Sequence, residues 1–197
     1  VDKNYKLCDS LKGVDFNNKR VILVTAHRRE NLGEPLKNIC RALKRIVTDF
    51  EDVQIVYPVH LNPAVREVAF DILGDIDRVM LIDPVDVRDL HNAMDRCHLV
   101  LTDSGGLQEE APSLGKPVLV LRNETERPEA VEAGTVRIAG VNEDDIYNMT
   151  STLLTDEGEY NKMAHAVNPY GDGQASRRTV EAILYHFGMG ERPKDLA

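Results

Sequence analysis

The chain has 197 residues, of which 42% are hydrophobic and 29% are charged, the composition of a globular protein with one sizeable core. Its formal net charge of −9 disfavours non-specific binding to nucleic acid or anionic membranes, and no apolar run approaches the about 20 residues that a membrane span needs. The polar N-terminus and three scattered cysteines (Cys8, Cys40 and Cys97) indicate a cytoplasmic protein with free thiols rather than a secreted, disulfide-linked one.

Six apolar, β-branched runs alternate with amphipathic stretches along the first 140 residues, and only helical patterns follow them. This alternation predicts an α/β fold in which a doubly wound parallel sheet carries helices on both faces. The predicted strands cover residues 20–25, 53–59, 78–83, 98–103, 117–122 and 135–140, and the predicted helices cover 34–50, 62–74, 87–97, 105–115, 142–155, 157–167 and 175–187.

Polar residues gather where the predicted strands end. TAHRREN follows the first strand, PVHLNP the second, TDSGG the fourth and RNETERPEA the fifth. In an open parallel sheet, ligands bind outside the carboxyl ends of the strands. We therefore expect a binding site at this edge of the sheet.

The segment TDSGGLQEE takes the chain from a strand into a helix. Ser104 is a good helix N-cap, and Gly105 and Gly106 would let a phosphate approach the free backbone N–H groups of the first turn. Glu110, about one turn further on, suits the two hydroxyls of a ribose. The alternative is an ordinary strand–helix turn whose glycines serve only tight packing. The segment is neither a GxGxxG motif nor a P-loop.

Three further loops contribute candidate residues. His27 and Arg28 lie in TAHRRENLG, where an imidazole and a guanidinium can bind phosphate, although a solvated charged loop is the alternative. His60 lies in the equivalent place after the next strand, where a purely structural role is also open. Arg127, held by the proline that follows it, is the favoured cation of the fifth loop.

The remaining polar groups suggest no other chemistry. No pair of His or Cys residues has metal-ligand spacing, and no Ser-His-Asp arrangement or nucleophile elbow appears. We interpret the other four histidines as structural or exposed: His91, His98, His165 and His186. The residues alone therefore predict a phosphate- or nucleotide-binding α/β domain without an identified reaction.

Five long segments occur in a fixed order: VTAHRRENLG, YPVHLNPAVRE, TDSGGLQEEAPSLGKPVLVLR, TERPEAVEAGTVRIAG and NPYGDGQAS. Together they resemble the carboxy-terminal half of the bacterial, non-hydrolysing UDP-N-acetylglucosamine 2-epimerases, over roughly residues 18–187. That family is similar to the GT-B glycosyltransferases, in which two Rossmann-like domains hold a nucleotide sugar between them. The resemblance thus implies a Rossmann-like, UDP-binding half of a GT-B fold.

The resemblance also implies how the chain is organised. Residues 1–197 would form a single UDP-binding domain, in which 1–18 are the connecting segment and 175–187 are a helix that crosses back toward an amino-terminal catalytic domain. The sequence does not contain that amino-terminal domain, which carries the acidic residues assigned to proton transfer. We expect either a separately produced domain or a natural truncation, inactive on its own.

The resemblance assigns roles to the residues already singled out. His27 is the catalytic candidate, near the diphosphate and the sugar. Ser104 and Gly106 would hold phosphate oxygens, Gly105 would shape the turn, and Glu110 would accept hydrogen bonds from the ribose hydroxyls.

The resemblance also assigns residues to the charge of the diphosphate, to an allosteric site and to the surroundings of the uracil. Arg127 would stabilise charge near the diphosphate. Arg28 and His60 match positions of an allosteric site for a second UDP-GlcNAc, which favours the non-hydrolysing type. Val85 and Leu90 stand where the family often has a glutamine and an aromatic residue near the uracil, so uracil contacts there would rely on backbone or apolar packing.

The reaction implied is inversion at C2, which interconverts UDP-GlcNAc and UDP-ManNAc by elimination and re-addition of UDP. It needs no metal and no other cofactor. The full-length family is expected to be homodimeric and to serve cell-envelope polysaccharide synthesis. Two alternatives remain open. One is the donor-binding half of a GT-B glycosyltransferase, although the HRREN and TERPEA segments argue against it. The other is a non-catalytic nucleotide-sugar-binding module.

Overall fold

The computed structural model describes residues 1–2 and 4–194. Its centre is a six-stranded sheet with the strand order β3-β2-β1-β4-β5-β6, and every neighbouring pair is parallel. All six predicted strands are confirmed: the first has its whole predicted length, the second, third and fourth are shortened by one or two residues, and the fifth and sixth are half as long as predicted. The strands are β1 (Arg20–Thr25), β2 (Val53–Pro58), β3 (Val79–Ile82), β4 (Leu99–Thr102), β5 (Val118–Val120) and β6 (Val136–Ile138).

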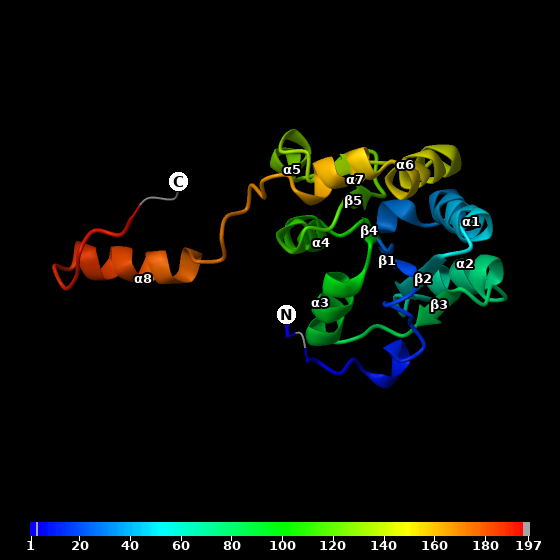
Figure 1. Cartoon of the computed structure of the whole chain (residues 1–197), viewed down its shortest axis with the longest axis horizontal. Helices are drawn as coiled ribbons and strands as arrows, with labels where there is room; N and C mark the ends of the chain where they lie inside the picture. Colours follow the sequence, from blue (N-terminus) through cyan, green and yellow to red (C-terminus); the bar gives the residue numbers. More distant parts are fainter. Residues whose placement is uncertain (3, 195–197) are drawn as a thin grey trace.

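Helices cover both faces of the sheet (Figure 1). Successive side chains of a strand point to opposite faces, so Ile22 and Val24 join one core cluster while Val21 and Leu23 join the other. This confirms the predicted doubly wound arrangement. The first cluster packs against α1 (Glu34–Asp49), α2 (Pro63–Leu73), α6 (Glu143–Thr155) and α7 (Glu157–Ala164), and the second against α3 (Val87–Arg96), α4 (Gly105–Glu110) and α5 (Pro128–Glu132).

Two helical features differ from the prediction. The single helix expected over 105–115 is wrong, because α4 is followed by the 3₁₀ helix η3 (Ala111–Leu114). Pro112 lacks the N–H group that would continue the α-helical ladder to the carbonyl of Gln108. The short helix α5 is not predicted at all, since five residues are too few to show an apolar period.

The strand order reverses beside β1, and this reversal marks the carboxyl edge of the sheet there as the expected place for a ligand. The chain runs outward from β1 through β2 to β3, and then returns to β4 on the other side of β1. Loops on the two sides of such a reversal part from each other and leave room for a ligand at the carboxyl ends of the strands. The loops that follow β1 and β4 flank this point, and they carry the His27 and Ser104 segments.

The C-terminal segment leaves the sheet and ends in α8 (Ala175–His186), which stands apart from the other helices (Figure 1). None of the residues of α8, all of them described, is buried. Exposed apolar side chains lie one helical turn apart along it and just beyond its end: Val180, Ile183, Leu184 and Phe187. No described helix is long and apolar enough to cross a membrane.

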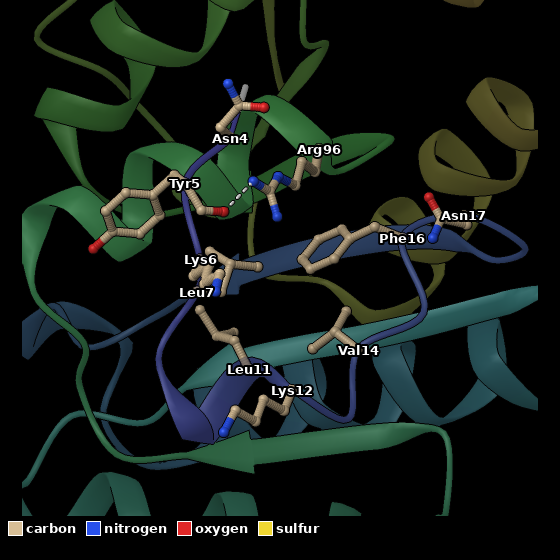
Figure 2. A pocket seen from close by; sticks show the side chains of 10 residues that line it. All are labelled: Asn4, Tyr5, Lys6, Leu7, Leu11, Lys12, Val14, Phe16, Asn17 and Arg96. Atoms are coloured by element: carbon tan, nitrogen blue, oxygen red, sulfur yellow. Dashed lines mark hydrogen bonds between the residues drawn. The ribbon is translucent and has the colours of Figure 1, made fainter. Parts of the chain in front are cut away.

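The segment before β1 packs against the second core cluster and contains the 3₁₀ helix η1 (Asp9–Leu11). An open cavity of about 730 Å³ lies between this segment and the end of α3, and Figure 2 shows the side chains that line it. Arg96 closes one side of it by donating from Nη2 to the carbonyl oxygen of Tyr5 at 2.7 Å. Because α3 ends just before β4 begins, this cavity lies at the amino edge of the sheet, opposite the predicted site.

Candidate functional site

The loops after β1 and β4 are tied together where the two strands end. Thr25 and Thr102 are direct partners in the sheet, and their Oγ1 atoms lie 2.6 Å apart. The backbone N–H of Ser104 donates to Thr102 Oγ1 at 2.9 Å. These hydroxyl contacts fix the start of α4 relative to the loop that contains His27.

A buried carboxylate orders the loop after β1. Asp103 Oδ2 accepts hydrogen bonds from the backbone N–H groups of His27 and Arg28, both at 2.7 Å, and from Asn31 Nδ2 at 3.0 Å. Asp103 is fully buried, and its carbonyl oxygen accepts a further bond from Arg28 Nε at 3.2 Å. The charged TAHRRENLG loop is therefore held against β4 and includes the 3₁₀ helix η2 (Arg29–Asn31). Its order does not depend on Arg–Glu pairing within the loop.

Ser104 stands at the N-cap position of α4, as predicted, but its hydroxyl caps no backbone N–H group. The capping role expected for this side chain is therefore wrong. Its backbone is extended, with φ −84° and ψ 128°, and Ser104 Oγ would lie 3.9 Å from a Cβ placed on Gly106. The hydroxyl thus stays available at the opening of the helix.

The two glycines leave space that the fold itself does not require. Neither has a positive φ, and a Cβ added at either would make only ordinary van der Waals contacts. A Cβ on Gly105 would lie 3.8 Å from Arg127 Nη2 and 3.9 Å from Arg28 Nη2, and one on Gly106 would lie 3.8 Å from Glu110 Oε1. Tight packing thus fails to explain the glycines. Two guanidinium groups and a carboxylate surround the first turn of α4.

The cations of the site differ in how their charge is balanced. Arg122 is buried and paired with Glu30 at 2.8 Å and with Glu126 at 2.6 Å, and the Arg122 guanidinium lowers the pKa of Glu126 to about 2. Arg127 Nε pairs with Glu109, whose carboxylate raises the pKa of Arg127. Arg28 forms no ion pair within 4 Å in the described part of the chain, and its charge acts on the Glu126 carboxylate only at longer range.

A relay of polar side chains joins α4 to the loop that carries Arg127. Gln108 is fully buried and donates from Nε2 to the Ser104 carbonyl oxygen at 3.3 Å. Its Oε1 accepts from Thr125 Oγ1 at 2.5 Å, and that hydroxyl accepts from the backbone N–H of Arg127 at 3.1 Å. No pattern in the sequence predicts this relay. Its only trace in the sequence is Gln108, an amide side chain at a position of the short helix that faces the protein interior.

The loops after β1 and β2 meet through two imidazole rings. The rings of His27 and His60 are stacked, with centroids 5.2 Å apart and an angle of 6° between the planes. His60 Nδ1 accepts from the backbone N–H of Asn62 at 3.1 Å, so the hydrogen of its neutral form is on Nε2. The structure thus brings together the two histidines that the sequence analysis singled out.

His91 also belongs to this site, although the sequence analysis interprets it only as structural or exposed. Its Nε2 lies 3.0 Å from Glu110 Oε2, so one carboxylate oxygen is engaged while Oε1 lies on the side of Gly106. The other three histidines lie elsewhere: His98 stacks on Tyr160, His165 Nδ1 contacts the carbonyl of Asn161, and His186 packs against Phe187.

Other expectations concern the uracil region and the thiols. Val85 and Leu90 are partly buried against the second core cluster, so both are committed to apolar packing. Cys8, Cys40 and Cys97 are free, as predicted. No group of three or more His, Cys, Asp or Glu side chains within the described part of the chain could hold a metal ion.

The fold and the site together define a Rossmann-like α/β protein of the GT-B type. At its topological switch point lies the first turn of α4 with Ser104, Arg28 and Arg127 around it, a group that we call the seat. A likeness of fold alone extends to the C-terminal domain of a glycosyl transferase group 1 family protein from Francisella tularensis. That domain is 14% identical, with a TM-score of 0.60 over 76% of this chain and 82% of that one.

The chain belongs to the UDP-N-acetylglucosamine 2-epimerase family, whose family model matches residues 1–184. The Bacillus subtilis UDP-N-acetylglucosamine 2-epimerase is 62% identical over 89% of this chain and 46% of its own length. The Staphylococcus aureus MnaA–UDP co-structure is 50% identical, with a TM-score of 0.92 over 100% of this chain and 53% of that one. UDP-GlcNAc 2-epimerase from Neisseria meningitidis bound to UDP-GlcNAc is 47% identical, with a TM-score of 0.82 over 86% of this chain and 46% of that one. The chain spans about half the length of the curated relatives it matches.

Proposed function

We propose that this chain is the UDP-binding half of a UDP-N-acetylglucosamine 2-epimerase, and that it binds the UDP portion of the nucleotide sugar between the loops after β1 and β4. The observation that carries the proposal is the open first turn of α4, where the guanidinium groups of Arg28 and Arg127 both lie within 4 Å of the position of a Cβ on Gly105. Two relatives whose structures contain UDP or UDP-GlcNAc support it, because they match this chain at 50% and 47% identity.

Each part of the seat suits one part of the ligand. The N–H groups at the start of α4 and the Ser104 hydroxyl would donate to the diphosphate, and both arginines would balance its charge. Glu110 Oε1 would accept hydrogen bonds from the ribose hydroxyls, while His91 holds the other carboxylate oxygen. His27 would reach the bond between the diphosphate and the sugar.

The same groups would assist the proposed reaction. When the bond between sugar C1 and the phosphate oxygen breaks, negative charge develops on the departing UDP. Preorganised N–H groups and guanidinium groups aimed at that oxygen lower the barrier because their interaction is strongest in the transition state. Removal and return of the C2 proton would fall to residues of the other half of the fold, so this chain alone is expected to bind UDP without epimerising the sugar.

The allosteric role and the chain's organisation stay predictions. His60 stacks on His27, which would place a second nucleotide sugar beside the first. Arg28 also reaches the seat over Gly105, so its charge would be shared between the two ligands. Three further assignments belong to the same proposal. Residues 1–18 would be a connecting segment, residues 175–187 would be a crossing helix, and the full-length protein would be a homodimer. The glycosyltransferase alternative has only a likeness of fold in its favour.

The experiment is calorimetric titration of the chain with UDP, repeated with Ser104→Ala and Glu110→Ala. Saturable binding that both substitutions weaken at least tenfold supports the proposal. Ser10→Ala and Glu67→Ala serve as matched controls, because both side chains are exposed and lie on η1 and α2, outside the seat. Equal affinity in all five proteins would place the nucleotide elsewhere, and no binding to the folded wild-type chain would overturn the proposal.

A further inference from the structure

Asp103 has one carboxylate oxygen more than its structural role uses. Oδ2 accepts all three hydrogen bonds from the loop after β1, while Oδ1 is buried without a hydrogen-bond partner in the described residues. A buried oxygen that carries part of a negative charge is costly to leave unpaired. An asparagine, with its single side-chain oxygen, would hold the loop equally well.

His27 lies close to the unused oxygen. Its Nδ1 lies 3.6 Å from Asp103 Oδ1, beyond hydrogen-bond distance but within reach of a small rotation of the ring. The stacked ring of His60 covers one face of the imidazole and limits its motion largely to its own plane. Hydrogen bonds within binding and catalytic sites are often long in ligand-free proteins and shorten when the ligand binds.

We propose that Asp103 is a positioning residue for His27. Its Oδ1 keeps the neutral imidazole in the tautomer with hydrogen on Nδ1, so that Nε2 is turned toward the ligand seat. The nitrogen that carries the hydrogen in a neutral histidine is set by the partner of the other nitrogen, and a buried carboxylate stabilises an adjacent N–H group. The relevance of this tautomer to a nucleotide sugar rests on the proposed function, but the tautomer itself is a property of the free chain.

Asp103→Asn separates the structural role from the positioning role. The amide oxygen can replace Oδ2 as the acceptor for His27 N–H, Arg28 N–H and Asn31. The amide nitrogen then replaces Oδ1 and presents a donor to His27 Nδ1. His27 Nδ1 must then accept this hydrogen bond, so the hydrogen of the neutral imidazole moves to Nε2. A residue that only held the loop would leave the tautomer unchanged.

The measurement is a long-range ¹H–¹⁵N NMR spectrum of the histidine rings of the full chain at about pH 8.5, where an ordinary imidazole is neutral. We expect His27 in the Nδ1–H form in the wild type and in the Nε2–H form in Asp103→Asn, with the amide signals of the loop retained. His27→Gln assigns the signal. His60→Gln, which removes the stacked ring but no hydrogen-bond partner of His27, should leave the wild-type tautomer in place.

A wild-type His27 in the Nε2–H form would overturn the proposal, and this result needs no variant to fold. The same tautomer in the wild type and a folded Asp103→Asn would overturn it too. UDP titration of both proteins adds a separate readout, with affinity expected to fall about tenfold in Asp103→Asn, the loss typical of one charge-assisted hydrogen bond. If UDP fails to bind the wild type, the proposed function fails, and the tautomer still decides the role of Asp103.

Discussion

The guanidinium groups of Arg28 and Arg127 converge over Gly105, within 4 Å of the position that a side chain on this glycine would occupy. They come from the loops after β1 and β5, on either side of the start of α4. Two like charges in this arrangement repel each other unless an anion lies between them. Glu109 pairs with Arg127, and no ion pair of Arg28 is seen in the described residues, so the Arg28 guanidinium is available to bind a phosphate oxygen.

Gly105→Ala tests whether the space between these arginines is functional. The added methyl group would lie at ordinary contact distance, so we expect the free energy of unfolding to change by less than about 1 kcal/mol. UDP affinity should fall at least tenfold, because the methyl group projects into the seat. Urea unfolding and calorimetry on the same preparation give both values. A large loss of stability with unchanged affinity would show that this glycine serves packing.

Thr125→Val tests the relay between α4 and the Arg127 loop. The substitution keeps the shape of the side chain but removes the hydroxyl that joins Gln108 Oε1 to the Arg127 N–H. We expect UDP affinity to fall about three- to tenfold as Arg127 loses its fixed position, in line with about 1 kcal/mol for one hydrogen bond. Thr48→Val, which removes a hydroxyl bond on the surface of α1, is the matched control and should bind UDP normally.

The role of Glu110 predicts discrimination between ribose and deoxyribose. Loss of the 2′-hydroxyl leaves the carboxylate with one hydrogen-bond donor fewer, so 2′-deoxy-UDP should bind about tenfold more weakly than UDP. In Glu110→Ala the two ligands should bind equally, because the acceptor is absent. Retained discrimination in this variant would assign ribose recognition to another residue. His91→Gln should keep the preference for UDP but reduce its size.

His98 predicts a loss of stability in mild acid. Burial, together with the nearby cationic Arg20 and Lys116, lowers the pKa of His98 to about 4, whereas an unfolded histidine titrates near 6.5. Below pH 6.5 the unfolded chain binds the proton first, so stability is highest above pH 6.5 and falls as the pH is lowered toward 4. After allowance for the partial exposure of the ring, the contribution is about 1–2 kcal/mol.

Urea unfolding of the wild type and of His98→Phe at pH 7.5 and pH 4.5 isolates this contribution. Phenylalanine can keep the stacking against Tyr160, which has its ring centroid 4.4 Å from that of His98. We expect the wild type to lose more stability than the variant between the two pH values, since the carboxylates titrate in both. Parallel losses would contradict the assignment.

The sequence predicts the sheet well because parallel strands are buried on both faces and appear as continuous apolar runs. It also predicts that polar loops meet at the carboxyl edge, as His27 and His60 do. The reversal of strand order between β1 and β4 depends on tertiary packing, which no local pattern records. The prediction for helix 105–115 fails at Pro112, although the proline is visible in the sequence.

The supporting residues of the site are the part that the sequence does not reveal. Asp103 and Gln108 lie within the TDSGGLQEE segment, but they act through hydrogen bonds to loops far away in the chain, so no local pattern reveals their partners. His91 meets Glu110 only because α3 and α4 lie side by side on one face of the sheet. Motif residues were recognisable because their types match phosphate and ribose chemistry, and this reasoning does not extend to the residues that hold them.

The central claim is the place where the nucleotide binds, and backbone amide NMR shifts on addition of UDP test it most directly. The account predicts the largest shifts at Ser104, Gly105 and Gly106 and in the loop that contains His27 and Arg28, with little change in α8. Shifts concentrated instead in the cavity at the amino edge of the sheet, around Tyr5 and Arg96 (Figure 2), would contradict it.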